Sequence, residues 1–199
     1  GIPKPWYADE TPQQKIFLKG FYIDKFEVTN ERYKKYVDDL GAALPENWKN
    51  NNFPEGKNKE PVIWVNWFDA ANFCQWAQKK LPTEKQWERA AKGTEGNKYP
   101  WGNKFQHGIA NLSKNAGSKN KAVAVGSHPQ SASKEGIHDL VGNVWEWVKD
   151  DYKAYKDSKD KNLIGFAGAP WTLLMYMLNK QSPKNNFDIN KIIKNKSLI

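Results

Sequence analysis

Hydrophobic positions recur at helical spacing in three segments of the chain. In the first segment, four apolar side chains share one helical face: Tyr33, Tyr36, Val37 and Leu40. Thr29 precedes this run and is a favourable N-cap residue, because its hydroxyl can accept a hydrogen bond from a free backbone N–H. Gly41 follows the run and predicts the end of the helix, since glycine adopts the left-handed conformation that closes many helices.

Two further helices are predicted after the segment Pro61 to Trp67. The second helix has its apolar stripe at Ala70, Phe73, Cys74 and Ala77. In the third, Thr83 and Gln86 have the spacing of a capping box, in which side chain and backbone groups satisfy one another. This helix carries its apolar face at Trp87, Ala90 and Ala91 and is expected to end before Gly93.

Little other regular structure is expected. Partial alternation of apolar and polar residues predicts two short strands, Ile16–Leu18 and Phe21–Ile23. Residues 42–60 are rich in Asn, Pro and Gly and predict a loop. Residues 94–137 show almost no periodicity, and a loop this long in a compact domain needs something to organise it, such as bound ions or buried aromatic rings.

Composition bounds the class of protein. The 199 residues allow one domain, alone or with a tail, and 10 Trp supply large apolar surfaces although only 39% of residues are hydrophobic. No apolar run is long enough to span a membrane, and no signal peptide is visible, although an exported or periplasmic location stays open. The first residues suggest a trimmed start.

The net charge of +9 is concentrated near the C-terminus. Residues 1–151 hold 22 basic and 19 acidic side chains, whereas residues 152–199 hold 9 basic and 3 acidic ones. Only two of the basic residues are arginines, Arg32 and Arg89. Because sequence-specific nucleic-acid readers depend on the bidentate contacts of arginine, nucleic acid is not an expected partner.

The segment Gly142 to Trp147, with sequence GNVWEW, is the strongest candidate for chemistry. If it is extended, Trp145 and Trp147 face one side and Glu146 faces the other. A carboxylate held between two large rings needs a cation, hydrogen-bond donors or water. Asp139 lies seven residues upstream and the turn offers backbone carbonyls, which together favour a metal that prefers oxygen ligands.

Four motifs occur in an order that resembles the formylglycine-generating enzyme family, also called sulfatase-modifying factor domains. They are FYIDKFEVTNERY, PVIWVNWFDAANFCQWAQKKLPTEKQWERAAKG, YPWGN and GIHDLVGNVWEWVKDDY, and the resemblance covers about residues 8–152. It implies an α+β fold that is related to C-type lectins and poor in regular structure. Compared with that family, both ends of the domain look cut, so we expect a domain over residues 1–152.

The resemblance also implies an oxidase that converts a target cysteine to formylglycine with copper held by two cysteine thiolates beyond the GNVWEW segment. This chain contains one cysteine, Cys74, which matches a non-catalytic helix position and is expected to be a small buried residue. Copper is therefore not expected, and the chain by itself is not expected to be a competent oxidase. Two alternatives stay open: an oxidase whose C-terminal part is lost or replaced, and a lectin-like module that binds a protein or peptide in a pocket lined by Trp101, Trp145 and Trp147.

Calcium is the cofactor that the resemblance favours. Transferred to this sequence, the family's ligands are the side chains of Asp139 and Glu146 and the carbonyls of Gly142 and Val144. A second calcium position would begin at the Asn111 side chain and the Leu112 carbonyl, with further ligands from residues 113–122, which include no Asp or Glu. The alternative for Glu146 is a hydrogen bond to backbone donors of the long loop.

The C-terminal segment has a different character. Residues 162–177, NLIGFAGAPWTLLMYM, resemble part of uroporphyrinogen decarboxylase, and the match covers about residues 161–199. Such a fragment is too short for a (β/α)₈ barrel. We therefore expect residues 153–199 to be a fused or artefactual appendage, with a basic tail that packs on the first domain as the alternative.

Overall fold

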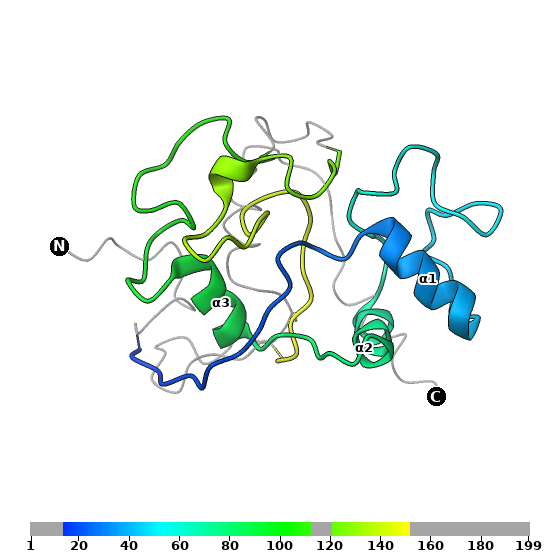
Figure 1. Cartoon of the computed structure of the whole chain (residues 1–199), viewed down its shortest axis with the longest axis horizontal. Helices are drawn as coiled ribbons and strands as arrows, with labels where there is room; N and C mark the ends of the chain where they lie inside the picture. The colour runs from blue at the N-terminus through cyan, green and yellow to red at the C-terminus, as the bar shows by residue number, and fades with distance from the viewer. Residues whose placement is uncertain (1–13, 113–120, 152–199) are drawn as a thin grey trace, which may run out of the picture.

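A computed structural model describes residues 14–112 and 121–151 of the chain. The described part contains three α-helices and one short 3₁₀ helix: α1 (Asn30–Leu40), α2 (Trp67–Trp76), α3 (Glu84–Lys92) and η2 (Pro129–Ser131). Figure 1 shows α1 and α2 on one side of the molecule and α3 on the other. The predictions for the tail at 153–199, including its decarboxylase-like part, lie outside the described residues.

Helix α1 begins and ends where the sequence predicts. The Thr29 hydroxyl accepts a hydrogen bond from the Arg32 N–H at 3.3 Å, and Gly41 has a φ of 64° with its N–H donating to the Val37 carbonyl. Of the predicted apolar face, Tyr33, Tyr36 and Val37 are buried. Leu40 is an exception, since it lies in the last turn and is 62% exposed.

Helices α2 and α3 both start with a capping box. In α2 the pair is Asn66 and Asp69, which exchange hydrogen bonds of 3.0 Å and 2.9 Å. In α3 it is the predicted pair Thr83 and Gln86, which exchange bonds of 3.2 Å and 2.9 Å. Each box satisfies backbone N–H groups that a helix start leaves without a partner, so both helices have defined first residues.

The two predicted strands are wrong. Residues 16–18 and 21–23 are extended without strand pairing, and the described ranges contain only isolated bridges: Thr29 with Pro61, Lys49 with Asn52 and Tyr99 with Gly102. Phe17 and Tyr22 are almost wholly exposed. The alternating pattern therefore forms no ladder, although Phe21 and Ile23 are half-buried, and the strand content expected of an α+β fold is not seen in the described part.

The first hydrophobic core lies where α1 packs against α2. Tyr33 stacks on Phe73 with ring centroids 5.5 Å apart, and both rings are buried together with Tyr36, Val37 and Trp48. Trp48 comes from the loop at 42–60, and its indole N–H donates to the Asn30 side chain. One loop residue thus closes the core that the two helices begin.

The second core lies under α3. It consists of Trp87 and Ala91 from the helix with Leu140 and Val148 from the segment that contains GNVWEW. Helix α3 therefore anchors both ends of that segment. None of the helices in the described ranges is long and apolar enough to cross a bilayer.

Two indole hydrogen bonds join the cores. Trp147 Nε1 donates to the Val65 carbonyl at 3.0 Å, and Trp67 Nε1 donates to the Val148 carbonyl at 2.8 Å. The approach to α2 and the end of the GNVWEW segment are thereby fixed side by side. This pairing places the motif between the two halves of the described structure.

Candidate functional site

The GNVWEW segment bends over residues 142–144 and forms no strand. Gly142 and Asn143 have φ values of 95° and 57°, in the left-handed region, and Asp139 shares it at 59°. A Cβ atom added to Gly142 would lie 2.5 Å from the Asn111 carbonyl oxygen. Glycine is therefore required at 142 both by the backbone conformation and by the close approach of Asn111.

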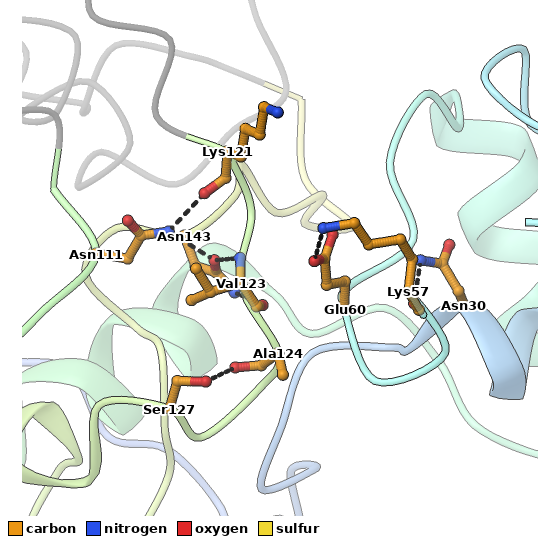
Figure 2. Close-up of polar contacts among 9 residues, drawn as sticks. All are labelled: Asn30, Lys57, Glu60, Asn111, Lys121, Val123, Ala124, Ser127 and Asn143. Atoms are coloured by element: carbon orange, nitrogen blue, oxygen red, sulfur yellow. Dashed lines mark hydrogen bonds and ion pairs between the residues drawn. The ribbon is translucent and has the colours of Figure 1, made fainter. Parts of the chain in front are cut away.

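The side chain of Asn143 holds this turn against a neighbouring segment. Its Oδ1 accepts from the Val123 N–H at 2.9 Å, and its Nδ2 donates to the Val123 carbonyl at 3.3 Å. Asn111 contributes a second contact, since its Nδ2 donates to Asn143 Oδ1 at 3.0 Å and to the Lys121 carbonyl at 3.1 Å (Figure 2). The two asparagines thus pair with the backbone at 121–123 in place of a strand.

Three carboxyl groups, those of Glu27, Asp139 and Glu146, interact electrostatically. Glu27, from the segment before α1, accepts from Asn143 Nδ2 at 2.7 Å, and its other oxygen is buried without a hydrogen-bond partner. Asp139 is 4% exposed and accepts from the Gly126 N–H at 2.6 Å. The Gly126 N–H of the long loop therefore donates to Asp139 and not to Glu146.

The environment of Glu27 and of Glu146 opposes the ionisation of their carboxyl groups. Burial and then the charge of Glu146 raise the pKa of Glu27 to about 9, against the opposing hydrogen bond from Asn143. Burial also raises the pKa of Glu146 to about 7, although the indole N–H of Trp87 partly opposes the rise. Trp87 Nε1 is buried without an acceptor at hydrogen-bonding geometry among the described residues. A cation here would relieve the repulsion among the acidic side chains.

The residues expected to hold calcium come from one short stretch of chain, and their chemistry fits a hard cation. Asp139 and Glu146 interact electrostatically, and no described N–H group donates to the carbonyl of Gly142 or Val144. Within the described ranges no three His, Cys, Asp or Glu side chains form a metal-binding group. A site of two carboxylates and two carbonyls does not require one, because Ca²⁺ accepts neutral backbone oxygens as ligands.

The second expected calcium position lies directly against the first turn. The Asn111 carbonyl accepts from the Asn143 N–H at 3.1 Å, and the Leu112 side chain lies beside Gly142. Most of the loop that was expected to supply the remaining ligands, at 113–120, lies outside the described residues.

The three candidate ligand-lining tryptophans do not come together. A cavity of about 780 Å³ is lined by Trp145 and Trp147, together with Glu27 and Glu146. Trp101 is not part of its wall: it stacks on Tyr99 at 5.2 Å and donates to the Lys104 carbonyl. Trp145 is 59% exposed. Trp147 is half-buried, and its indole N–H donates to the Val65 carbonyl.

Cys74 lies on α2 in the wall of the same cavity and packs against the first core. It is half-buried, and burial raises the pKa of its thiol, with the charge of Asp24 acting in the same direction. A thiol in this environment is mostly protonated at neutral pH and is a poor nucleophile and metal ligand.

Sequence reasoning missed the part played by Glu27. Asp24, three residues before Glu27, forms salt bridges with Arg32 at 2.9 Å and with Lys79. Glu27 instead contacts Asn143, 116 positions away in the sequence. No local pattern identifies such a contact, because it depends on how distant segments pack.

Comparison with known proteins identifies the family. Residues 4–193 match the family described as the Sulfatase-modifying factor enzyme 1-like domain. The chain is 32% identical over 211 residues to the Inactive C-alpha-formylglycine-generating enzyme 2 of Bos taurus, covering 81% of this chain and 69% of that protein. It is 29% identical over 192 residues to the Formylglycine-generating enzyme of Mus musculus, covering 71% of this chain and 52% of that enzyme.

Among solved structures, the crystal structure of CarF shares 22% identity, with a TM-score of 0.49, over 67% of this chain and 69% of that one. The family assignment rests on the domain match and not on this superposition. Because the domain match covers almost the whole sequence, the chain belongs to the sulfatase-modifying factor enzyme 1-like domain family.

Proposed function

We propose that this chain is a sulfatase-modifying-factor-type domain that is not by itself a competent formylglycine-generating oxidase. The observation that carries the proposal is the single cysteine, Cys74. The oxidase members that the sequence resembles hold copper with two thiolates, and one half-buried thiol with a raised pKa does not fit that site. No copper-dependent step is therefore assigned to this chain. The similar bovine protein is also named inactive.

A turnover assay tests this proposal. The full chain, supplied with copper, is incubated with a cysteine-containing sulfatase peptide, and aldehyde formation is followed by mass spectrometry beside the mouse formylglycine-generating enzyme. We expect product from the mouse enzyme alone. Copper-dependent product from this chain would overturn the proposal, and its loss in Cys74→Ser would then identify Cys74 as the reactive thiol.

Calcium is proposed as a structural ion bound by Asp139, Glu146 and the carbonyls of Gly142 and Val144. Two features support it: the carboxyl groups of Glu27 and Glu146, which burial and nearby negative charge hold against ionisation, and the carbonyls of Gly142 and Val144, which accept no hydrogen bond from described residues. Bound calcium would supply positive charge to this group and brace the turn. An ion at 100 times its dissociation constant adds about 2.7 kcal/mol to the free energy of unfolding.

Thermal unfolding with and without a chelator tests the calcium proposal. We expect the chelator to lower the melting temperature of the wild-type chain and to have a much smaller effect on Glu146→Gln. Glu55→Gln is the matched control, because Glu55 is exposed. If the chelator left the melting temperature of the wild-type chain unchanged, the calcium proposal would be wrong.

The cavity favours a second candidate, a lectin-like binding module for a protein or peptide. It is lined by Trp145, whose large exposed ring is the kind of group that anchors ligands. A sulfatase peptide with its target cysteine replaced by serine tests this by fluorescence anisotropy. Trp145→Ala should weaken binding, whereas Trp64→Ala, an exposed residue outside the cavity wall, should not; equal affinities would argue against the module.

A further inference from the structure

The extended segment at residues 14–24, the edge segment, makes no backbone hydrogen bond within the described ranges. Its apolar side chains are poorly covered, since Ile16 is 43% exposed, Phe17 is 88% exposed and Tyr22 is wholly exposed. Free N–H and C=O groups beside exposed apolar side chains form a template to which another strand can add. The alternation at 16–23 is therefore the pattern of a strand that lacks its partner.

The edge segment also borders the cavity of about 780 Å³. Phe21 and Ile23 line the cavity from the edge segment, and Trp145 lines it from the GNVWEW segment. Val62 and Leu140 add further apolar side chains to the wall. Both segments run through the space between α3 and the pair of α1 and α2 (Figure 1). A strand that paired with the edge segment would have this cavity beside it to receive its apolar side chains.

The charge around the cavity is positive. Four exposed lysines make no ion pair within the described ranges: Lys15 and Lys19 on the edge segment, and Lys80 and Lys149 in the cavity wall. The Lys149 N–H donates to the carbonyl of Pro82, which is two residues after Lys80. The two lysines of the wall therefore lie on neighbouring segments.

Acidic side chains in the same wall do not balance these lysines. Asp24 is occupied by its salt bridges with Arg32 and Lys79. The carboxyl groups of Glu27 and Glu146 are held against ionisation by burial and by nearby negative charge. An occupant that reaches the wall lysines therefore meets unpaired positive charge, which favours acidic side chains in that occupant.

Charge also disfavours two other occupants. Residues 152–199 hold 9 basic and 3 acidic side chains, so they would add positive charge to a positive edge. A second copy of the chain would place Lys15 and Lys19 of both copies on one short ribbon. We propose that residues 16–23 are a docking edge for an extended acidic strand of a partner protein, which pairs with their backbone and fits its apolar side chains into the cavity. The inference rests on the proposed binding module and names the class of its ligand.

A short fluorescein-labelled peptide of alternating valine and glutamate tests the docking edge, with binding to the full chain followed by fluorescence anisotropy. We expect this peptide to bind and its valine–lysine counterpart not to bind. Lys149→Glu should weaken binding at least about 5-fold, which is the strength of one surface ion pair. Lys98→Glu is the matched control and should leave the affinity unchanged, because Lys98 is exposed and outside the cavity wall. An equal affinity of the Lys149→Glu and Lys98→Glu variants would overturn the inference.

Two methylated forms of the peptide separate strand pairing from charge attraction alone. One form is methylated at its odd backbone nitrogens and the other at its even ones, so both keep every side chain. Successive N–H groups of a strand point to opposite sides, and only one set faces the docking edge. We expect one form to lose binding and the other to keep it. Equal affinities of the two forms would show that no strand is added.

The remaining outcomes distinguish this inference from the binding module. Binding of the serine-substituted sulfatase peptide through Trp145, without binding of the valine–glutamate peptide, overturns the inference and leaves the module standing; failure of both peptides overturns both. A dimer in sedimentation velocity that excludes the peptide, or tighter binding of a synthetic peptide of residues 162–177, assigns the edge to another occupant and also overturns the inference. If Lys149→Glu lacks a native near-ultraviolet circular dichroism spectrum, Lys19→Glu is titrated with the same outcomes.

Discussion

At the scale of single residues, the site depends on a few positions whose backbone or side chain has little freedom. Gly142 allows the Asn111 carbonyl to approach, and Asn143 fills its hydrogen-bonding capacity in a left-handed conformation. Asp139 takes the same conformation while its carboxylate caps Gly126. Strained, buried polar residues of this kind persist where surrounding contacts determine them and are frequent at functional sites.

Replacing Gly142 by alanine should destabilise the chain by about 1–3 kcal/mol, because the φ of 95° disfavours a side chain and the new Cβ meets the Asn111 oxygen. Urea unfolding followed by circular dichroism measures the change. Gly20→Ala is the control, since nothing lies within 4 Å of its added Cβ. Equal stability of Gly142→Ala and the wild-type chain would show that the turn relaxes without cost.

The ionisation of Glu27 should make stability depend on pH when calcium is chelated. In the unfolded chain this group ionises near its ordinary pKa of 4.5, whereas in the folded chain it keeps its proton up to about 9. Its contribution to the free energy of unfolding is therefore complete below about pH 4.5 and is lost as pH rises toward 9.

Urea unfolding at pH 5, 7 and 9 in chelator should show this decline for the wild-type chain and a flatter profile for Glu27→Gln. Glu55→Gln should keep the wild-type decline. The same slope for Glu27→Gln and the wild-type chain would show that Glu27 ionises normally in the folded state.

At the scale of elements, helix positions were predictable and strands were not. Thr29, Thr83 and Gly41 act on backbone groups within a few residues, so their effect is visible in the sequence. A strand needs a partner, and the alternation at 16–23 gives no information about one. The same limit applies to the 121–123 segment, whose hydrogen bonds go to two asparagine side chains.

Removing the cap of α3 tests how much this local signal contributes. Thr83→Ala loses the hydroxyl that accepts from Gln86 and should lower the free energy of unfolding by about 1 kcal/mol. Chemical denaturation measures the loss, and Thr94→Ala, an exposed threonine after the helix, is the control. A loss no larger than that of the control would mean that packing of Trp87 alone defines the helix start.

At the scale of the whole molecule, the described part has two cores joined through tryptophan side chains. The first core forms between α1 and α2 and the second under α3. The two indole bonds, from Trp147 to Val65 and from Trp67 to Val148, cross between segments more than 80 residues apart. The candidate site lies along the segment that these bonds hold.

Removing one of these bonds should affect both cores together. Trp147→Phe keeps an aromatic ring but leaves the Val65 carbonyl without its donor, which should cost about 1–3 kcal/mol. Trp64→Phe is the control, because that ring is 66% exposed. Hydrogen exchange followed by mass spectrometry should show faster exchange in α2 and α3 alike; faster exchange confined to one helix would mean that the cores are independent.

The sequence by itself determined the three helices, the caps of α1 and α3, the family and the motif that carries the candidate ligands. These properties depend on local hydrogen bonding and on the order of short motifs, both of which a linear sequence contains. Tertiary structure alone decided that Glu27 joins Asp139 and Glu146, that Trp101 lies apart from Trp145 and Trp147, and that Asn143 connects the turn to Asn111. The physical reason is that these arrangements depend on the burial and close packing of distant segments, and neither residue type nor spacing encodes which segments meet.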